Sequence, residues 1–229
     1  MITGEQLLEV FAAYNPQIWP MQFVAYLLGV AAVYLALRKT LLSERGIPAI
    51  LAFFWLWVAL LFWLPSVLQG FTSGYFFVAI FLIQGLLFLN FAIRPRLHFR
   101  YQLGLQTWIG LGMVIYAMVG YPLVGSLVGH SYPRMPPFGL TPCPLVTFTF
   151  GLLLLSERKA PKVLLILPFF YSLSGFIWVS IGMWEDIGMI LSGLVGTGWI
   201  LYRDSRVPAE SQVNGGWSLD IPDKKSTNG

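Results

Sequence analysis

Long apolar segments, separated by short polar gaps, fill most of this chain and leave few folds open to it. The runs cover residues 18–37, 47–69, 75–93, 103–128, 142–155, 163–182 and 187–202. Several of them reach the roughly 20 residues that a helix needs to cross about 30 Å of hydrocarbon. Backbone polar groups inside a membrane must be satisfied within each segment, which favours helices. We therefore predict an all-α integral membrane protein, a bundle of seven transmembrane helices.

The composition excludes a soluble domain. Of the 229 residues, 57% are hydrophobic and 10% are charged, which is too little polar surface to cover a water-exposed fold. We expect the lipid bilayer to be the main partner. The net charge of +4 does not indicate nucleic-acid binding, because the basic residues are scattered over the ends of the apolar runs.

The distribution of charge predicts an orientation. All Lys and Arg residues except Arg134 fall into every second gap between the runs or into the C-terminal tail. These basic residues are Arg38, Lys39, Arg45, Arg94, Arg96, Arg100, Arg158, Lys159, Lys162, Arg203, Arg206, Lys224 and Lys225. By the positive-inside rule the N-terminus lies outside and the C-terminus lies in the cytoplasm.

The two ends of the chain differ from the membrane domain, which covers residues 18–202. Residues 1–17 carry a capping-box pattern at Thr3 and Gln6, followed by apolar residues at helical spacing, and predict an amphipathic helix on the outer membrane surface. Residues 203–229 mix charges with Gly, Ser, Pro and Asn, and predict a disordered cytoplasmic tail.

Small residues recur at four-residue spacing in two of the runs. Gly125 and Gly129 form one such pair, and Gly188, Ser192 and Gly196 form a stripe. Such spacing lets two helices approach closely. We interpret both as packing within the bundle, with homo-oligomerisation as the alternative.

The segment 129–144 concentrates the chemistry of the chain, since it holds five prolines, the single cysteine and the one outward arginine. The apolar run that follows has about fourteen residues, about 21 Å of helix, which is short for a full span. Non-helical backbone can complete the crossing only where protein buries it or a wet cavity is lined. The missing thickness can be made up by a re-entrant outer loop, by local thinning of the bilayer, or by helix beyond Leu155. Of these we favour the re-entrant loop, and we predict a pocket that opens outward and is floored by residues 142–144.

The candidate ligand-binding residues are those of this loop and the two acids of the last outer turn. They are His130, Tyr132, Arg134, Cys143, Glu185 and Asp186. We expect the two acids at the membrane boundary, because charges in mid-membrane are costly.

Four interpretations of these residues remain open. In the first, they form a packed outer cap in which Arg134 pairs with Glu185 or Asp186. In the second, they bind or conduct a small anion or polar solute. In the third, His130 and Cys143 bind a soft metal, with Met135 as a further ligand. In the fourth, Cys143 is a nucleophile with His130 as its base. One Cys and two His residues are too few for a zinc ribbon, an iron–sulfur cluster or a bis-His haem, so no cofactor and no catalytic residue are assigned.

The chain resembles a family of uncharacterised bacterial multipass inner-membrane proteins. The resemblance rests on Gly129-His130-x-Tyr132-Pro133, Phe138-Gly139 and Pro142-Cys143-Pro144-x-x-Thr147-Phe148-Thr149-Phe150-Gly151. Tyr14-Asn15-x-x-x-Trp19-Pro20 and Glu185-Asp186 are similar as well, so the resemblance extends to about Tyr202. It implies a bacterial inner membrane and no activity or ligand.

We therefore predict that a small solute or anion binds at, or passes through, the outer pocket. A non-catalytic assembly or packing protein is the alternative.

Overall fold

A computed structural model of the protein describes residues 3–38, 40–68, 70–71, 74–95, 97–99, 104–157 and 160–205. The fold in these ranges is all-α, as predicted, and one isolated β-bridge joins Phe99 to Ser156. The predicted tail falls outside the described residues from position 206 onward. The basic residues Lys39, Arg96, Arg100, Arg158 and Lys159 fall outside them as well.

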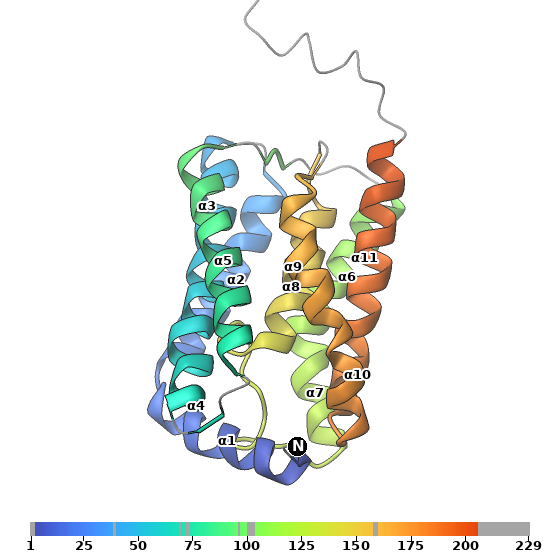
Figure 1. Ribbon diagram of the computed structural model, residues 1–229. Coiled ribbons are helices and arrows are strands. Elements are labelled where there is room, and N and C mark those ends of the chain that lie inside the picture. The colour runs from blue at the N-terminus through green and yellow to red at the C-terminus, as the bar shows by residue number, and fades with distance from the viewer. Residues whose placement is uncertain are drawn as a thin grey trace, which may run out of the picture.

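The helices form an elongated bundle, with one helix laid across an end of it (Figure 1). Their bounds are α1 (Gly4–Gln17), α2 (Met21–Ala36), α3 (Leu41–Trp57), η1 (Val58–Trp63), α4 (Leu64–Leu68), α5 (Gly74–Ile93), α6 (Leu105–Ile115), η2 (Tyr116–Gly120), α7 (Tyr121–Leu127), α8 (Pro142–Leu154), α9 (Val163–Leu173), α10 (Gly175–Ser180), η3 (Trp184–Asp186) and α11 (Ile187–Ser205). The elements η1 and η2 are π-helical turns that join α3 to α4 and α6 to α7 without a break.

Four of these helical segments are long and apolar enough to cross a membrane. They are Leu41–Leu68, Gly74–Ile93, Leu105–Leu127 and Val163–Ser180. The pair α1 and α2 passes the same test together, but the chain bends by 90° between the two helices. Large apolar side chains such as Leu27, Phe76 and Trp108 are exposed on the bundle. The protein is thus a helical membrane protein with several spans, and the number of seven stays a prediction.

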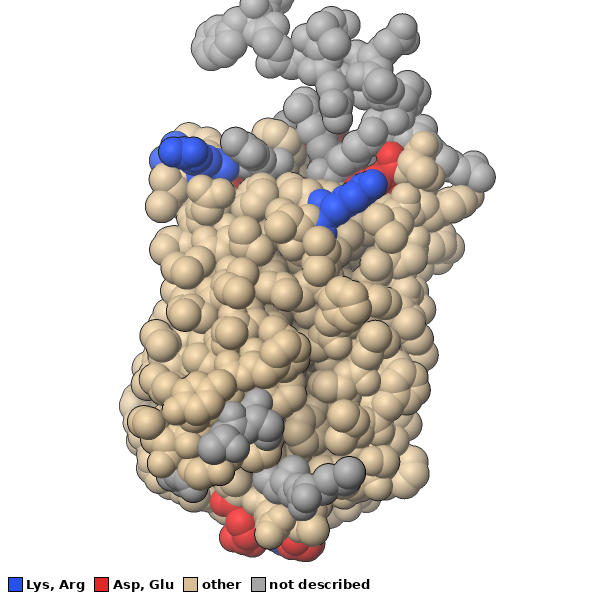
Figure 2. Space-filling model, in the orientation of Figure 1, with Lys and Arg blue, Asp and Glu red and all other residues tan. Residues whose placement is uncertain are grey.

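Charged side chains gather at the two ends of the molecule. On the face seen in Figure 2, the end that carries α1 shows Asp and Glu, and the opposite end shows Lys and Arg with acidic atoms beside them. The described residues between the two ends are uncharged on this face. The helices α2, α5 and α11 terminate at the basic end of the molecule, and α3 and α9 begin there (Figure 1). Two acids have basic partners near these termini. Glu44 Oε1 lies 2.5 Å from His98 Nδ1, and Arg203 Nε donates to Asp204 Oδ1 at 2.8 Å.

The short helix α8 is surrounded by protein. Every residue from Pro144 to Leu154 is buried, and α3, α6, α9 and α11 all contact the helix. Close approach depends on glycine: a Cβ at Gly151 would lie 2.8 Å from the carbonyl oxygen of Gly110 in α6. On the other side, a Cβ at Gly196 of α11 would lie 2.9 Å from the ring of Phe150. Gly196 therefore packs within the chain, as our packing interpretation of its stripe expects.

The proline-rich segment before α8 runs into the bundle rather than across its end. Phe138 is 2% exposed, and its ring packs edge-on against Phe54 of α3 and Phe148 of α8. A Cβ at Gly29 of α2 would lie 2.6 Å from that ring, so the backbone of α2 meets the loop directly. The 13 residues of α8 span only about 20 Å. The loop thus fills the part of the interior that α8 does not reach.

Candidate functional site: an aromatic cleft under the first helix

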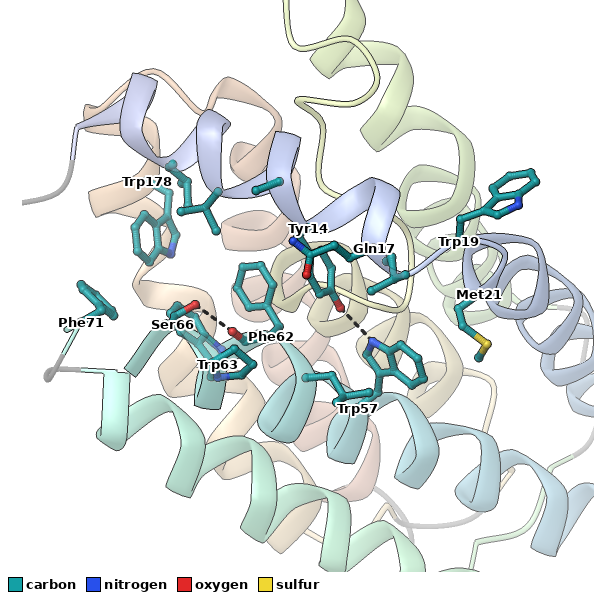
Figure 3. A pocket seen from close by; sticks show the side chains of 16 residues that line it. Tyr14, Gln17, Trp19, Met21, Trp57, Phe62, Trp63, Ser66, Phe71 and Trp178 are labelled. Carbon is teal, nitrogen blue, oxygen red and sulfur yellow. Dashed lines mark hydrogen bonds between the residues drawn. The ribbon is translucent and has the colours of Figure 1, made fainter. Parts of the chain in front are cut away.

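A cleft of about 610 Å³ lies between α1 and the segment α3–η1–α4 (Figure 3). Seven of the sixteen residues that line it are aromatic. We call it the aromatic cleft, and its aromatic residues are Tyr14, Trp19, Trp57, Phe62, Trp63, Phe71 and Trp178. Leu7, Val10 and Tyr14 of α1 line it because they recur at helical spacing on the face turned to the bundle. The described residues that line the cleft include no Asp, Glu, Lys, Arg or His.

Hydrogen bonds from the loop and from α3 hold α1 across the end of the bundle. Trp57 Nε1 donates to Tyr14 Oη at 2.8 Å, and Tyr14 Oη donates to the carbonyl oxygen of Leu140 at 2.9 Å. The amide nitrogen of the buried Asn15 donates to the carbonyl oxygens of Pro133 and Met135 at 2.6 and 2.7 Å. The predicted capping box at Thr3 and Gln6 begins the helix. These contacts fix the roof of the cleft.

Arg134 of the loop also helps to hold α1 across the end of the bundle. Its guanidinium forms ion pairs with Glu5 and, at 3.0 Å, with Glu9, both exposed on α1. The pairing of Arg134 with Glu185 or Asp186 in the packed-cap interpretation is therefore wrong. Glu185 and Asp186 are buried, whereas Glu5 and Glu9 are exposed.

Glu185 and Asp186 form a buried acidic cluster with His130, Tyr121 and Cys143. Glu185 is 0% exposed and Asp186 is 1% exposed, so protein covers both acids at the turn between α10 and α11. Their expected depth at the membrane boundary stays a prediction. His130 Nδ1 lies 3.0 Å from Glu185 Oε1, and Tyr121 Oη donates a hydrogen bond to Asp186 Oδ1. The Cys143 thiol interacts with the Asp186 carboxyl group. Burial raises the pKa of Asp186 from 3.8 to about 7.

A small cavity of about 20 Å³ lies between this cluster and the aromatic cleft. Its lining includes Tyr121, Pro142, Cys143 and Asp186, together with Leu7 and Phe11 of α1. Four residues line both this cavity and the cleft, namely Leu7, Phe62, Trp63 and Trp178. The aromatic cleft thus lies one layer of side chains away from residues 142–144, where the sequence predicts the floor of a pocket.

The structure divides the predicted site residues into three groups. His130, Cys143, Glu185 and Asp186 come together in the acidic cluster. Arg134 attaches α1. Tyr132 is 59% exposed and lines a separate surface pocket of about 260 Å³. None of the six lines the aromatic cleft.

A metal site gains no support from this arrangement. His130 pairs with Glu185 and Cys143 lies beside Asp186. Within the described ranges, no three His, Cys, Asp or Glu residues stand together in a group that could hold a metal ion.

Sequence reasoning missed the residues of the aromatic cleft. They come from α1, from α3–η1–α4, from α10 and from the segments that hold Trp19 and Phe71, and many of these are far apart in the chain. The concentration of aromatic residues in 53–63 was the available signal, but such residues are equally typical of a membrane helix that faces lipid.

Comparison with known proteins gives a family and no function. No curated protein and no solved structure matches the chain significantly. The family described as "Family of unknown function (DUF6064)" matches residues 4–211, which includes α1, the loop before α8 and the acidic cluster. The chain belongs to this family of unknown function, DUF6064.

Proposed function

We propose that this protein binds a small amphipathic molecule in the aromatic cleft, at the outer face of a bacterial inner membrane. The observation that carries this proposal is the cleft itself. Its volume of about 610 Å³ falls within the range of about 300–1,000 Å³ typical of small-molecule sites. Aromatic walls with a few polar groups, here Gln17 and Ser66, suit an apolar body with a polar end.

The proposed topology has seven spans, formed by α2, α3–η1–α4, α5, α6–η2–α7, α8, α9–α10 and α11. In the proposed orientation the end that carries α1 lies outside. The acids at that end and the basic residues at the other end support this orientation (Figure 2). In this arrangement α1 lies on the outer surface and the cleft opens at interfacial depth, where amphipathic molecules accumulate.

An anion is a poor ligand for this cleft. Its lining offers no Lys, Arg or His, and Arg134 is occupied by Glu5 and Glu9. We therefore narrow the predicted solute to a neutral or cationic molecule.

The binding test uses triphenylphosphine oxide, a neutral amphipathic probe, and purified protein in lipid nanodiscs. We expect saturable quenching of tryptophan fluorescence beyond that seen with empty nanodiscs. Trp63→Leu should weaken binding about tenfold by removing an aromatic wall. Trp108→Leu is the matched control, since Trp108 is exposed on α6 and outside the cleft. Non-saturable quenching, or equal loss in both variants, would favour an assembly or packing protein instead.

The orientation test uses a membrane-impermeant maleimide on whole cells and a Cys143→Ser background. Ser131→Cys, in the exposed loop beside α1, should be labelled from outside. Ser205→Cys, at the exposed end of α11, should be labelled only after the cells are opened. The reverse pattern would refute the proposed orientation.

A further inference from the structure

The acidic cluster holds a buried carboxyl group, that of Asp186, without a cationic partner among the described residues. Glu185 lies beside His130, whose Nδ1 is 3.0 Å from Glu185 Oε1. Asp186 is held by the neutral Tyr121 and Cys143, and none of the described Lys, Arg or His residues forms an ion pair with it. An ionised carboxylate in a buried site is costly unless a positive charge or a proton compensates it.

Asp186 is also close to the aromatic cleft. It lines the small cavity whose other walls include Trp63 and Trp178, and both of these side chains line the cleft as well. A charge in the cleft would therefore be separated from Asp186 by one layer of side chains. Little water or salt screens a charge at such a buried position.

The same cavity has one buried polar atom without a hydrogen-bond partner among the described residues. This atom is Trp63 Nε1, in a residue that is 5% exposed and lines both the cavity and the cleft. Buried polar atoms usually find a partner, so Trp63 Nε1 can donate a hydrogen bond to a water molecule or a ligand that enters from the cleft.

We propose that the cleft selects amphipathic organic cations, and that binding of such a cation releases a proton from Asp186. This inference rests on the proposed function and names its ligand class. Aromatic faces attract organic cations, and the acids Glu5 and Glu9 lie on the roof helix. One cation enters as one proton leaves the carboxyl group, so the charge of the site is unchanged.

The surroundings of Asp186 make this exchange feasible near neutral pH. The titratable groups around it are Tyr121 of α7, Cys143 of α8, Tyr171 of α9, Tyr116 of η2, its neighbour Glu185 and His130 of the loop. Burial raises the pKa of Asp186 to about 7, so a nearby cation would shift a carboxyl group that is partly protonated. By linkage, the cation then binds more tightly as the pH rises.

The experiment compares three probes of similar shape, namely tetraphenylphosphonium, triphenylphosphine oxide and tetraphenylborate. Binding to the protein in nanodiscs is corrected for binding to empty nanodiscs. We expect the cation to bind more tightly than the oxide and the borate to bind most weakly. The affinity for the cation should rise about tenfold from pH 6 to pH 8, and that for the oxide should not change. A weakly buffered sample should acidify on addition of the cation.

Two variants make the assignment to Asp186 specific. Asp186→Asn should abolish both proton release and the pH dependence while it leaves binding of the oxide intact. Tyr121→Phe, which removes a hydrogen bond to the carboxylate, should move the midpoint of the pH dependence upward, and it serves also if Asp186→Asn does not fold.

Each outcome separates this inference from the proposed function. Equal affinities for cation and oxide, or a pH dependence that survives in Asp186→Asn, would overturn the inference and leave the proposed function standing. If the oxide does not bind either, the proposed function fails first.

Discussion

Trp57 Nε1 donates a 2.8 Å hydrogen bond to Tyr14 Oη and so joins α3 to the helix that roofs the cleft. Tyr14 in turn donates to the carbonyl oxygen of Leu140. Three segments that are distant in the sequence therefore meet at one phenol oxygen.

Tyr14→Phe should destabilise this end of the molecule. The change leaves the Trp57 N–H and the Leu140 carbonyl without a partner, which typically costs about 1–3 kcal/mol in the free energy of unfolding. Denaturation in mild detergent measures it. Tyr132→Phe removes a hydroxyl group from an exposed side chain and should have little effect. Equal stability of the two variants would contradict the role of Tyr14.

Arg134→Gln should loosen α1 without unfolding the bundle. The variant loses both ion pairs to Glu5 and Glu9, so the amides of Gly4–Gln17 should exchange hydrogen faster. High salt should produce part of the same effect in the wild type, because these charges are exposed and salt screens them. Arg94→Gln, an exposed change after α5, is the control and should leave exchange in α1 unaltered.

The pH dependence of stability should reflect Asp186. The folded protein keeps the proton of this carboxyl group up to about pH 7, whereas the unfolded chain loses it near the ordinary pKa of 3.8. Between these values the folded state binds more protons, so the free energy of unfolding falls as the pH rises, by up to about 1.4 kcal/mol per pH unit. Thermal unfolding from pH 4 to pH 8 measures this slope. Asp186→Asn should flatten it, and an unchanged slope would assign it to other groups.

Gly151→Ala should disturb the contact between α8 and α6. Its Cβ would lie 2.8 Å from the carbonyl oxygen of Gly110 and 3.0 Å from the backbone nitrogen of Val114, so the helices must separate. We expect a loss of about 1–3 kcal/mol, as for other overpacked cores. Gly112→Ala on α6 is a matched control. Apart from the backbone of its own helix and its chain neighbours, no described atom lies within 4 Å of the added Cβ. Unfolding of both variants in the same detergent compares them.

The helices were predictable because hydropathy acts locally. A buried backbone must be hydrogen-bonded within its own segment, so a long apolar run predicts a helix without knowledge of its neighbours. The same argument predicted the short helix α8, whose 13 residues begin at Pro142 as the apolar run does. Because α8 is short, we also expected protein to bury the proline-rich loop that precedes it.

The site was less predictable because it depends on contacts between distant segments. Arg134 pairs with acids of α1 that lie 129 and 125 positions away, and no local pattern marks them as its partners. Glu185 and Asp186 were predicted at the membrane boundary because charges in mid-membrane are costly. Their burial beside His130, Tyr121 and Cys143 depends on contacts with distant segments, which no local pattern reveals.

The burial of α8 has a consequence for how the protein adapts to its lipids. A helix of about 20 Å in contact with lipid would force the surrounding bilayer to thin or the helix to recruit partners. Because neighbouring helices enclose α8, its length imposes no hydrophobic mismatch on the membrane. Only the outer helices need to match the lipid thickness, so the geometry beside Cys143 is insulated from changes in acyl-chain length.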